Sequence, residues 1–261
     1  MRSIWKGTIS FGMVAIPAKL YTAAEDRRVS FHLVHRECRG RVQLPRWCSN
    51  CERKLEPTEI QRVYEYAKGQ YVPMEDADFQ ALPLKTLRTV EVVEFVESGG
   101  IDPRVFEKSY FLAPDEMGGK PFRLLLRAME ETGLLAVGKL AYREREHLSL
   151  LRPYGKLLLL HTLFYADELR DPQAIPVPEA AVSEKELSMA LSLVKALKTD
   201  GFDLSKYQDD YRQALYELIE ARIAGEEVER VEVPAPTGAG DLESSLMASI
   251  EAILAKKGVE A

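Results

Sequence analysis

The sequence contains no long apolar run. No stretch reaches the roughly 20 consecutive apolar residues that a membrane-spanning helix needs, and the first residues, Met1–Gly7, lack the apolar core and cleavage site of a secretory signal. Cysteine is scarce, with 3 residues in 261, which excludes a secreted scaffold held together by disulfides. We therefore expect a soluble protein of the reducing cytoplasm, with one large domain or two smaller ones.

The short motifs of common catalytic sites are also missing. There is no G-x-x-x-x-G-K-[ST] phosphate loop, no G-x-G-x-x-G fingerprint and no G-x-S-x-G nucleophile elbow. Two of the 4 histidines, His147 and His161, fall in strand-like stretches, where hydrogen-bonded structural roles are commoner than catalysis. We expect no enzymatic activity.

The net charge of −6 is distributed unevenly along the chain. Residues 1–62 carry 12 Lys and Arg against 6 Asp and Glu, whereas residues 171–261 carry 9 against 18. Residues 63–170 are closer to balance, with 14 against 17. This asymmetry predicts one surface that faces an anionic partner and another that faces away from it. The alternative is an ordinary surface of salt bridges.

All cysteines lie in one arginine-rich stretch beside a histidine. His35, Cys38, Cys48 and Cys51 have the spacing H-x2-C-x9-C-x2-C, which suits a tetrahedral Zn²⁺ site with one imidazole and three thiolates. Four protein ligands leave no position for water, so the predicted zinc is structural. The alternatives are reduced core thiols, a disulfide within one pair, and His32 as a competing ligand.

Apolar alternation predicts a mainly β structure for the first 165 residues. A change of parity beside Gly12 is interpreted as a bulge or bend, and Lys68-Gly69 as the turn of a hairpin. One helix, at residues 121–132, interrupts the strands. The expected strands are 5–21, 29–34, 63–66, 70–72, 89–96, 110–112, 134–142, 148–151 and 157–165.

The last third of the chain reads as helical. Ser183 and Glu186 form a capping box for a helix that runs to about residue 199, and a second helix is expected at 205–224. The second helix carries an apolar stripe that favours packing against a second subunit. Its members are Tyr207, Tyr211, Leu215 and Leu218.

A linker rich in proline and glycine, residues 233–240, precedes a final helix in residues 241–261. Leu246 and Ile250 belong to the apolar stripe of this helix. Because a short tethered helix is unstable alone, we expect it to dock on a partner; the alternative is a frayed tail that packs on its own core.

Several strings together resemble prokaryotic Ku proteins, over almost the whole chain. They are Ile4–Gly7, Ile9–Val14, Ile16–Tyr21, the quartet His35, Cys38, Cys48 and Cys51, then Tyr64–Tyr66, Phe106–Pro114 and His161–Arg170. The resemblance implies a fold that is mainly β with α: a Ku-type β-barrel core with bridging strands at 1–170, containing the zinc-binding insertion at 35–51. A helical dimerisation arm at 171–232 and the tethered helix would follow.

The resemblance also implies a function. A homodimer would close a ring through which double-stranded DNA ends thread, in double-strand break repair by non-homologous end joining. The implied partner is an ATP-dependent DNA ligase, ligase D in many bacteria, recruited through the C-terminal helix. The zinc quartet is not uniform in the family, so the zinc expectation rests on the spacing in this sequence.

A ring that slides along any sequence contacts the phosphate backbone, which requires Lys and Arg on its inner face. Candidates come from the basic first quarter and from the charged connection near residue 144. They are Lys19, Arg27, Arg28, Arg36, Arg39, Arg41, Arg46, Arg143 and Arg145.

Three other functions compete with this interpretation. A zinc-ribbon transcription or RNA-associated factor would share the metal site but need no free DNA end. A purely structural adaptor would bind no DNA at physiological salt. A nuclease would need a convergent set of carboxylates, which the sequence does not show.

Overall fold

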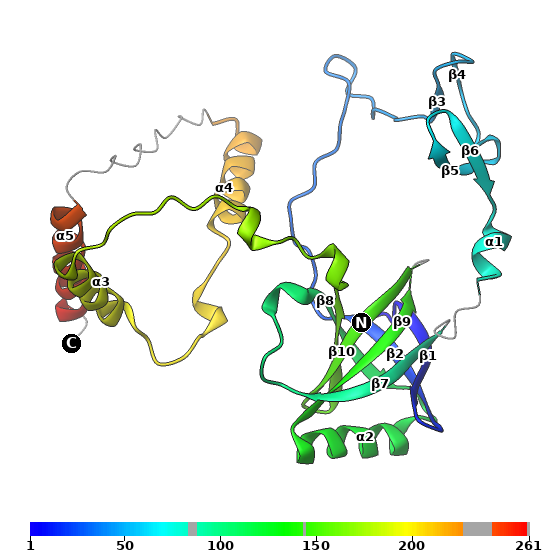
Figure 1. Ribbon diagram of the computed structural model, residues 1–261. Coiled ribbons are helices and arrows are strands. Elements are labelled where there is room, and N and C mark those ends of the chain that lie inside the picture. The colour runs from blue at the N-terminus through cyan, green and yellow to red at the C-terminus, as the bar shows by residue number, and fades with distance from the viewer. Residues whose placement is uncertain (83–87, 143–144, 227–241, 260–261) are drawn as a thin grey trace. The chain divides into compact units, whose positions relative to one another are not determined.

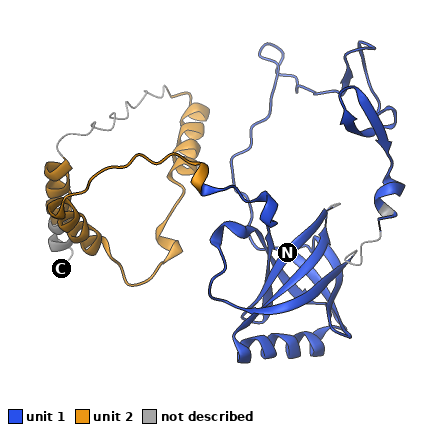
Figure 2. Ribbon diagram, viewed as in Figure 1, with its two compact units in different colours: residues 1–172 blue, residues 173–261 orange. Residues whose placement is uncertain are grey.

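The computed structural model describes residues 1–82, 88–142, 145–226 and 242–259 (Figure 1). The chain divides into two compact units, Met1–Pro172 and Gln173–Ala261 (Figure 2). In the part of the chain that is described, no helix has both the length and the apolarity to cross a membrane.

Unit 1 is built on a closed barrel of seven strands in the order β1-β2-β8-β11-β10-β9-β7. Their bounds are β1 Trp5–Phe11, β2 Val14–Thr22, β7 Thr89–Glu97, β8 Phe106–Pro114, β9 Leu134–Tyr142, β10 Arg145–Tyr154 and β11 Leu157–Leu163. Neighbouring strands are antiparallel except β1 and β7, whose parallel pairing, with Thr8 beside Thr89, closes the barrel. The expected mainly β fold with a barrel core is confirmed.

The change in the alternation of apolar residues near Gly12 corresponds to a tight turn. Phe11 pairs with Val14, so Gly12 and Met13 form a two-residue hairpin loop between β1 and β2. Gly12 has a φ of +57°, which hairpin turns of this length favour and which glycine adopts without strain. The interpretation as a bulge or bend was wrong, because two alternating strands meet at the turn.

The barrel encloses a core of alternate residues from its strands, including Ile9, Leu20, Leu112, Leu140 and Leu160, each less than 2% exposed. Helix α2 (Gly119–Thr132) completes this core with four buried side chains: Phe122, Leu125, Leu126 and Met129. The helix ends at Gly133 in the left-handed conformation. It lies across the end of the barrel where β8 stops and β9 starts (Figure 1).

Gly118, at the N-terminus of α2, predicts a measurable stability effect. A Cβ added there would lie 2.2 Å from the carbonyl oxygen of Pro17, and that oxygen already accepts a hydrogen bond from the Asp115 amide at 2.9 Å. We expect Gly118→Ala to destabilise unit 1 by about 2 kcal/mol, since both backbones must shift. Gly119→Ala is the matched control, because nothing lies within 4 Å of its added Cβ. Urea unfolding measures both variants, and equal stabilities would contradict the argument.

A long excursion, residues 23–88, connects β2 to β7. Its regular elements are β3 Trp47–Cys48, β4 Arg53–Lys54, β5 Arg62–Ala67, β6 Gln70–Met74 and α1 Asp76–Gln80. The predicted hairpin at Lys68-Gly69 is confirmed, with Ala67 paired to Gln70. The strand expected at 29–34 was wrong. Residues there alternate in polarity, but the only strand-type pairing in the described residues is an isolated bridge between Val34 and Arg41, beside which the Val42 amide donates to the Leu33 carbonyl oxygen at 3.0 Å.

Unit 2 contains α3 (Glu184–Leu197), α4 (Asp210–Ala224) and α5 (Leu242–Val259). The capping box of α3 is confirmed: the Glu186 amide donates to Ser183 Oγ at 3.2 Å, and the Ser183 amide donates to Glu186 Oε2 at 2.7 Å. In the described residues of both units, single 3-10 turns lie at Pro57–Glu59, Pro103–Val105, Ala166–Glu168, Pro172–Ala174 and Leu204–Lys206.

Helix α4 starts later than the sequence pattern predicted. Asp209 caps it by accepting a hydrogen bond from the Arg212 amide at 2.9 Å, so residues 205–209 precede the helix. Tyr207 therefore does not belong to the helical stripe. Its ring stacks on Phe202, with centroids 5.6 Å apart.

Candidate nucleic-acid interface and metal ligands

The structure sorts the predicted DNA-binding residues by their ion-pair partners. Lys19 pairs with Asp115, near the end of β8, and Arg145 pairs with Glu168. Arg28 Nε donates to Asp26 Oδ2 at 2.6 Å, and Arg27 lies 3.9 Å from Glu25. The hydrogen bond between Lys19 and Asp115 raises the pKa of the ammonium and lowers the pKa of the carboxyl. Each of these cations therefore has a neighbouring anion that offsets its attraction for phosphate.

Four of the predicted residues have no carboxylate partner among the residues described: Arg36, Arg39, Arg41 and Arg46. All four are exposed. The bridge between Val34 and Arg41 holds a small loop in which the Arg39 amide donates to the His35 carbonyl oxygen at 2.9 Å. Arg39 itself has a φ of +58°. Arg41 Nη2 lies 3.2 Å from His32 Nε2. The cations without a carboxylate partner thus lie close together in sequence, on one exposed segment.

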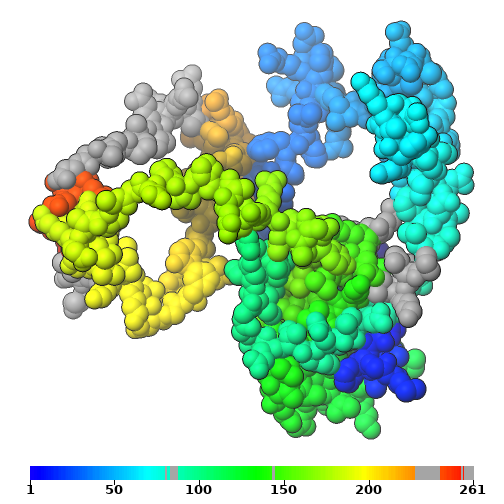
Figure 3. All heavy atoms as spheres, viewed as in Figure 1, coloured from blue at the N-terminus to red at the C-terminus, as the bar shows by residue number. Residues whose placement is uncertain are grey.

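This segment, residues 30–46, is called the arginine segment below. It is exposed almost throughout, and Figure 3 shows it as a narrow projection of unit 1. Such a segment presents guanidinium groups that can bind phosphates without first breaking an ion pair. The remaining predicted residue, Arg143, lies outside the described residues.

The predicted zinc ligands form two local pairs. His35 Nδ1 lies 3.2 Å from Cys38 Sγ, and the Gly40 amide donates to Cys38 Sγ at 3.4 Å. Cys48 is the last residue of β3 and Cys51 lies on the turn before β4; hydrogen bonds from the amides of Cys51 and Asn50 lower the pKa of the Cys48 thiol. Within the described ranges, no three His, Cys, Asp or Glu side chains are grouped to hold a metal ion.

The cysteines do not fit the alternative of core thiols. Cys38 and Cys51 are exposed and Cys48 is half-buried, and all three are free of disulfides. Beside them, Arg53 binds Glu59 through two hydrogen bonds of 3.0 and 2.6 Å. This bidentate pair ties β4 to the following 3-10 turn and so helps to fix the Cys48–Cys51 loop.

The two strand histidines have structural partners, as expected. Ser109 Oγ lies 2.9 Å from His161 Nδ1, and burial lowers the pKa of this imidazole. His161 Nε2 is buried without a hydrogen-bond partner, so no acid orients the ring as in a Ser-His-Asp triad. His147 Nδ1 lies 3.6 Å from Glu107 Oε2.

The predicted partner-facing residues behave differently in α4 and α5. In α4, Tyr211 is 78% exposed, Leu218 is exposed and Leu215 is half-buried. In α5, Leu246 and Ile250 are half-buried, and this helix packs against α3 of the same chain (Figure 1). An ion pair between Lys185 and Glu243 joins the first turns of the two helices.

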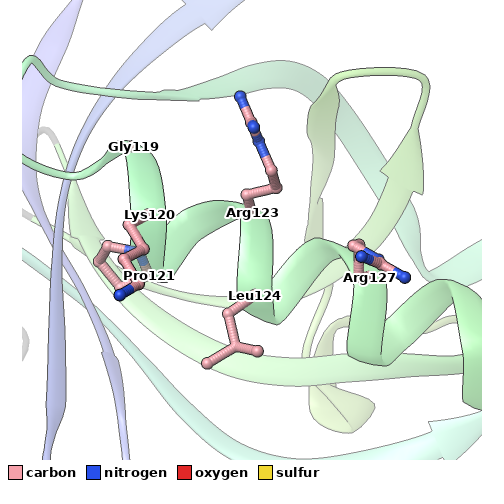
Figure 4. Close-up of a pocket in the computed structure, with 6 residues that line it drawn as sticks. All are labelled: Gly119, Lys120, Pro121, Arg123, Leu124 and Arg127. Carbon is pink, nitrogen blue, oxygen red and sulfur yellow. The ribbon is translucent and has the colours of Figure 1, made fainter.

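Sequence reasoning overlooked a cationic surface on α2. Lys120, Arg123 and Arg127 line one hollow on its outer side, with Leu124 between them (Figure 4). The signal was present, because residues at i, i+3 and i+7 share a helix face. It was missed because only the apolar face of this helix was considered.

Comparisons with known proteins match this architecture. A family model described as Ku70/Ku80 beta-barrel domain matches residues 10–189. A protein of Symbiobacterium thermophilum is 40% identical over 260 residues, which cover 98% of this chain and 64% of the relative. A Heliobacterium modesticaldum protein is 39% identical over 266 residues, covering 100% and 95%. A Bacillus subtilis protein is 38% identical over 256 residues, covering 96% and 82%.

All three relatives carry the name non-homologous end joining protein Ku. The fold and these matches define a barrel protein of the Ku70/Ku80 type. The chain belongs to the Ku family, as the resemblance implied. It spans less than two thirds of the length of the Symbiobacterium relative and nearly all of the Heliobacterium one.

Proposed function

We propose that this protein binds the ends of double-stranded DNA, independent of sequence, as a homodimeric ring in non-homologous end joining. The observation that carries the proposal is the family match over residues 10–189, with named relatives near 40% identity. The arginine segment supports it, because guanidinium groups without a carboxylate partner suit a phosphate backbone. We propose a scaffold without catalytic activity of its own, which recruits an ATP-dependent ligase of the ligase D type through residues 241–261.

The test of the function is topological. One duplex sequence is prepared as a linear fragment and as a covalently closed circle, and binding is measured by gel shift at low and physiological salt. We expect strong binding to the linear form and little to the circle, since a closed ring loads only over an end. Cutting the circle once should restore binding. Equal binding to both forms would instead favour the zinc-ribbon factor, and no binding would favour the adaptor.

We also propose a structural zinc ion held by His35, Cys38, Cys48 and Cys51. The donor types suit zinc, because the thiols are accessible and amide hydrogen bonds lower the pKa of the Cys48 thiol. The described residues group no three such side chains, so the proposal requires the His35–Cys38 and Cys48–Cys51 pairs to come together on binding. When bound, zinc would join the His35–Cys38 loop to the β3–β4 turn and stabilise the arginine segment. A site closed by four protein ligands supplies stability and leaves no open position for catalysis.

Zinc content should respond to single ligand changes. We expect Cys48→Ser and His35→Asn each to lower the zinc content well below the wild-type value and to lower the melting temperature, because metal binding contributes folding free energy. His32→Asn is the matched control and should retain zinc. Atomic emission on protein purified without chelators measures the metal. Full zinc content in Cys48→Ser would contradict the ligand set, and loss in His32→Asn would make His32 the ligand.

A further inference from the structure

The barrel end that carries α2 has a cationic surface built from two elements. Lys120, Arg123 and Arg127 lie on the outer face of the helix and line a hollow of about 550 Å³ (Figure 4). A second hollow, of about 370 Å³, adjoins the first, since Arg123 and Arg127 line both, and it adds Lys156. Lys156 belongs to the two-residue turn between β10 and β11. These four exposed cations are called the α2 patch below.

Carboxylates offset only part of the charge of the α2 patch. Three of its members have no carboxylate partner in the part of the chain that is described. The exception is Arg127, which lies 3.3 Å from Glu131 on its own helix, with both side chains 71% exposed; such exposed pairs contribute little and exchange readily. Glu130 lines the second hollow. The four cations therefore outnumber the two neighbouring carboxylates, and the surface is available to an anionic ligand.

The composition of this surface favours phosphate groups over a protein partner. The centre of a protein–protein interface is depleted of charged residues, whereas the α2 patch places charges around one large exposed apolar side chain, Leu124. A single exposed leucine is ordinary on a protein surface and needs no partner. The planar guanidinium groups of Arg123 and Arg127 suit bidentate hydrogen bonds to phosphate oxygens.

The spacing of the cations suits the backbone of a duplex. Lys120, Arg123 and Arg127 occupy positions i, i+3 and i+7 on one helix face, and they extend over about 10 Å of the helix axis. One strand of a duplex carries a phosphate for about every 3.4 Å of its own axis. A duplex that lies along α2 therefore presents several phosphates to this row, and Lys156 widens the surface to one side.

The α2 patch is separate from the arginine segment. In the register of the sheet, Thr22 pairs with Tyr110 and Ala18 with Pro114. The excursion that contains the arginine segment therefore leaves β2 at one end of the barrel, and the chain enters α2 at the other end. Each of the two cationic surfaces can contact DNA without the other.

We infer that the α2 patch is a second DNA-binding surface, which binds the phosphate backbone of a duplex other than the one held at its end. The patch is an open face, so it requires no DNA end, and backbone contacts carry no sequence information. The inference goes beyond the proposed function and depends neither on the homodimer nor on the ring. Four phosphate contacts lose about a hundredfold in affinity between about 50 and 200 mM salt, so this surface binds weakly on its own and acts on a duplex that is already close.

A DNA circle without ends isolates this surface. The patch variant carries Lys120→Gln, Arg123→Gln, Arg127→Gln and Lys156→Gln in the full-length protein. At low salt we expect the wild type to bind a covalently closed circle weakly and the patch variant to bind it about tenfold or more less tightly, with a salt slope shallower by about 0.9 for each contact removed. Affinity for the linear duplex at physiological salt should change by less than about twofold. Gel shift measures both, and circular dichroism verifies that the variant is folded.

The matched control removes the same number of positive charges at another place. It carries Lys195→Gln, Lys198→Gln, Lys206→Gln and Arg222→Gln, all at exposed residues of unit 2. We expect this control to keep the wild-type affinity for the circle, because the net charge changes equally but the α2 patch stays intact. Equal losses in the two variants would show that only net charge matters and would overturn the inference.

Capture of a circle tests whether two duplexes are held together. A biotinylated linear duplex on beads is loaded with protein at physiological salt, and a labelled closed circle is added. We expect the wild type to retain the circle and the patch variant to lose most of it while both stay on the linear duplex. Undiminished capture by the patch variant, or no capture by a wild type that binds the linear duplex, would overturn the inference and leave end binding standing. A wild type that fails to bind the linear duplex would overturn the proposed function, and the low-salt circle assay would still decide the inference.

Discussion

Replacing Arg36, Arg39, Arg41 and Arg46 together by glutamine is expected to weaken binding to linear duplex DNA by about a hundredfold or more at physiological salt. These guanidinium groups have no carboxylate partner in the described residues, so each can neutralise a phosphate and release a counterion. The loss should be the same for every DNA sequence. The slope of log affinity against log salt should become shallower by about 0.9 for each contact removed.

The matched control replaces Lys19, Arg27, Arg28 and Arg145 by glutamine. Each of these already has a carboxylate beside it, and we expect affinity to fall by less than about threefold, since little net attraction for phosphate is removed. Fluorescence anisotropy at three salt concentrations, with two unrelated duplexes, measures both variants. A control that loses as much affinity as the first variant would show that ion pairing does not distinguish the residues that contact DNA. A loss that depends on sequence would indicate contacts to base edges.

Deletion of the chain after Val233 is expected to leave DNA-end binding intact and to abolish stimulation of an ATP-dependent ligase. Helix α5 packs on α3 within unit 2, and the barrel and the arginine segment belong to unit 1. Removing α5 therefore takes nothing from the proposed DNA surface. An end-joining assay with a purified ligase of the ligase D type gives the stimulation, and gel shift on the same duplex gives the binding. Undiminished stimulation by the shortened chain would refute ligase recruitment by this helix.

Point variants refine this experiment, because the two sides of α5 differ. Leu246 and Ile250 are half-buried on the side that packs against α3, whereas Leu242 and Met247 are 56% and 55% exposed. We expect Met247→Asp to reduce stimulation while α5 stays packed on α3. Leu246→Asp should also release the helix, which increased hydrogen exchange in α5 would report. Full stimulation by Met247→Asp would show that the exposed side is not the ligase contact.

Local patterns predicted the elements whose stability depends on neighbours in sequence. The capping box of α3 needs only Ser183 and Glu186, three residues apart, and the hairpin at Lys68-Gly69 needs only its turn and flanking strands. Sequence patterns gave wrong predictions where the formation of a strand depends on pairing with a segment distant in sequence. Residues 29–34 alternate like a strand, yet in the described chain they pair only through the isolated bridge between Val34 and Arg41. Asp209 as the cap of α4 was overlooked although it is local.

For the candidate sites the division is similar. The spacing of His35, Cys38, Cys48 and Cys51 predicted a zinc site, and the structure shows that the four residues form two local pairs; their role as zinc ligands stays a prediction. Charge counts identified the basic first quarter of the chain, but they could not distinguish the cations that have a carboxylate partner from those that do not. Sorting them required ion pairs such as Lys19–Asp115 and Arg145–Glu168, which join residues far apart in the chain.

The sequence by itself determined the family, most strands of the barrel and the helices, the spacing of the candidate ligands and the asymmetry of charge, because these follow from residue type and short-range periodicity. Only the tertiary structure decided the closure of the barrel through β1 and β7, the four arginines without a carboxylate partner in the described residues, the packing of α5 on α3 and the cationic face of α2. Each of these depends on which distant segments meet. Short-range periodicity does not predict these tertiary contacts, because it only determines which face of a helix or strand is apolar.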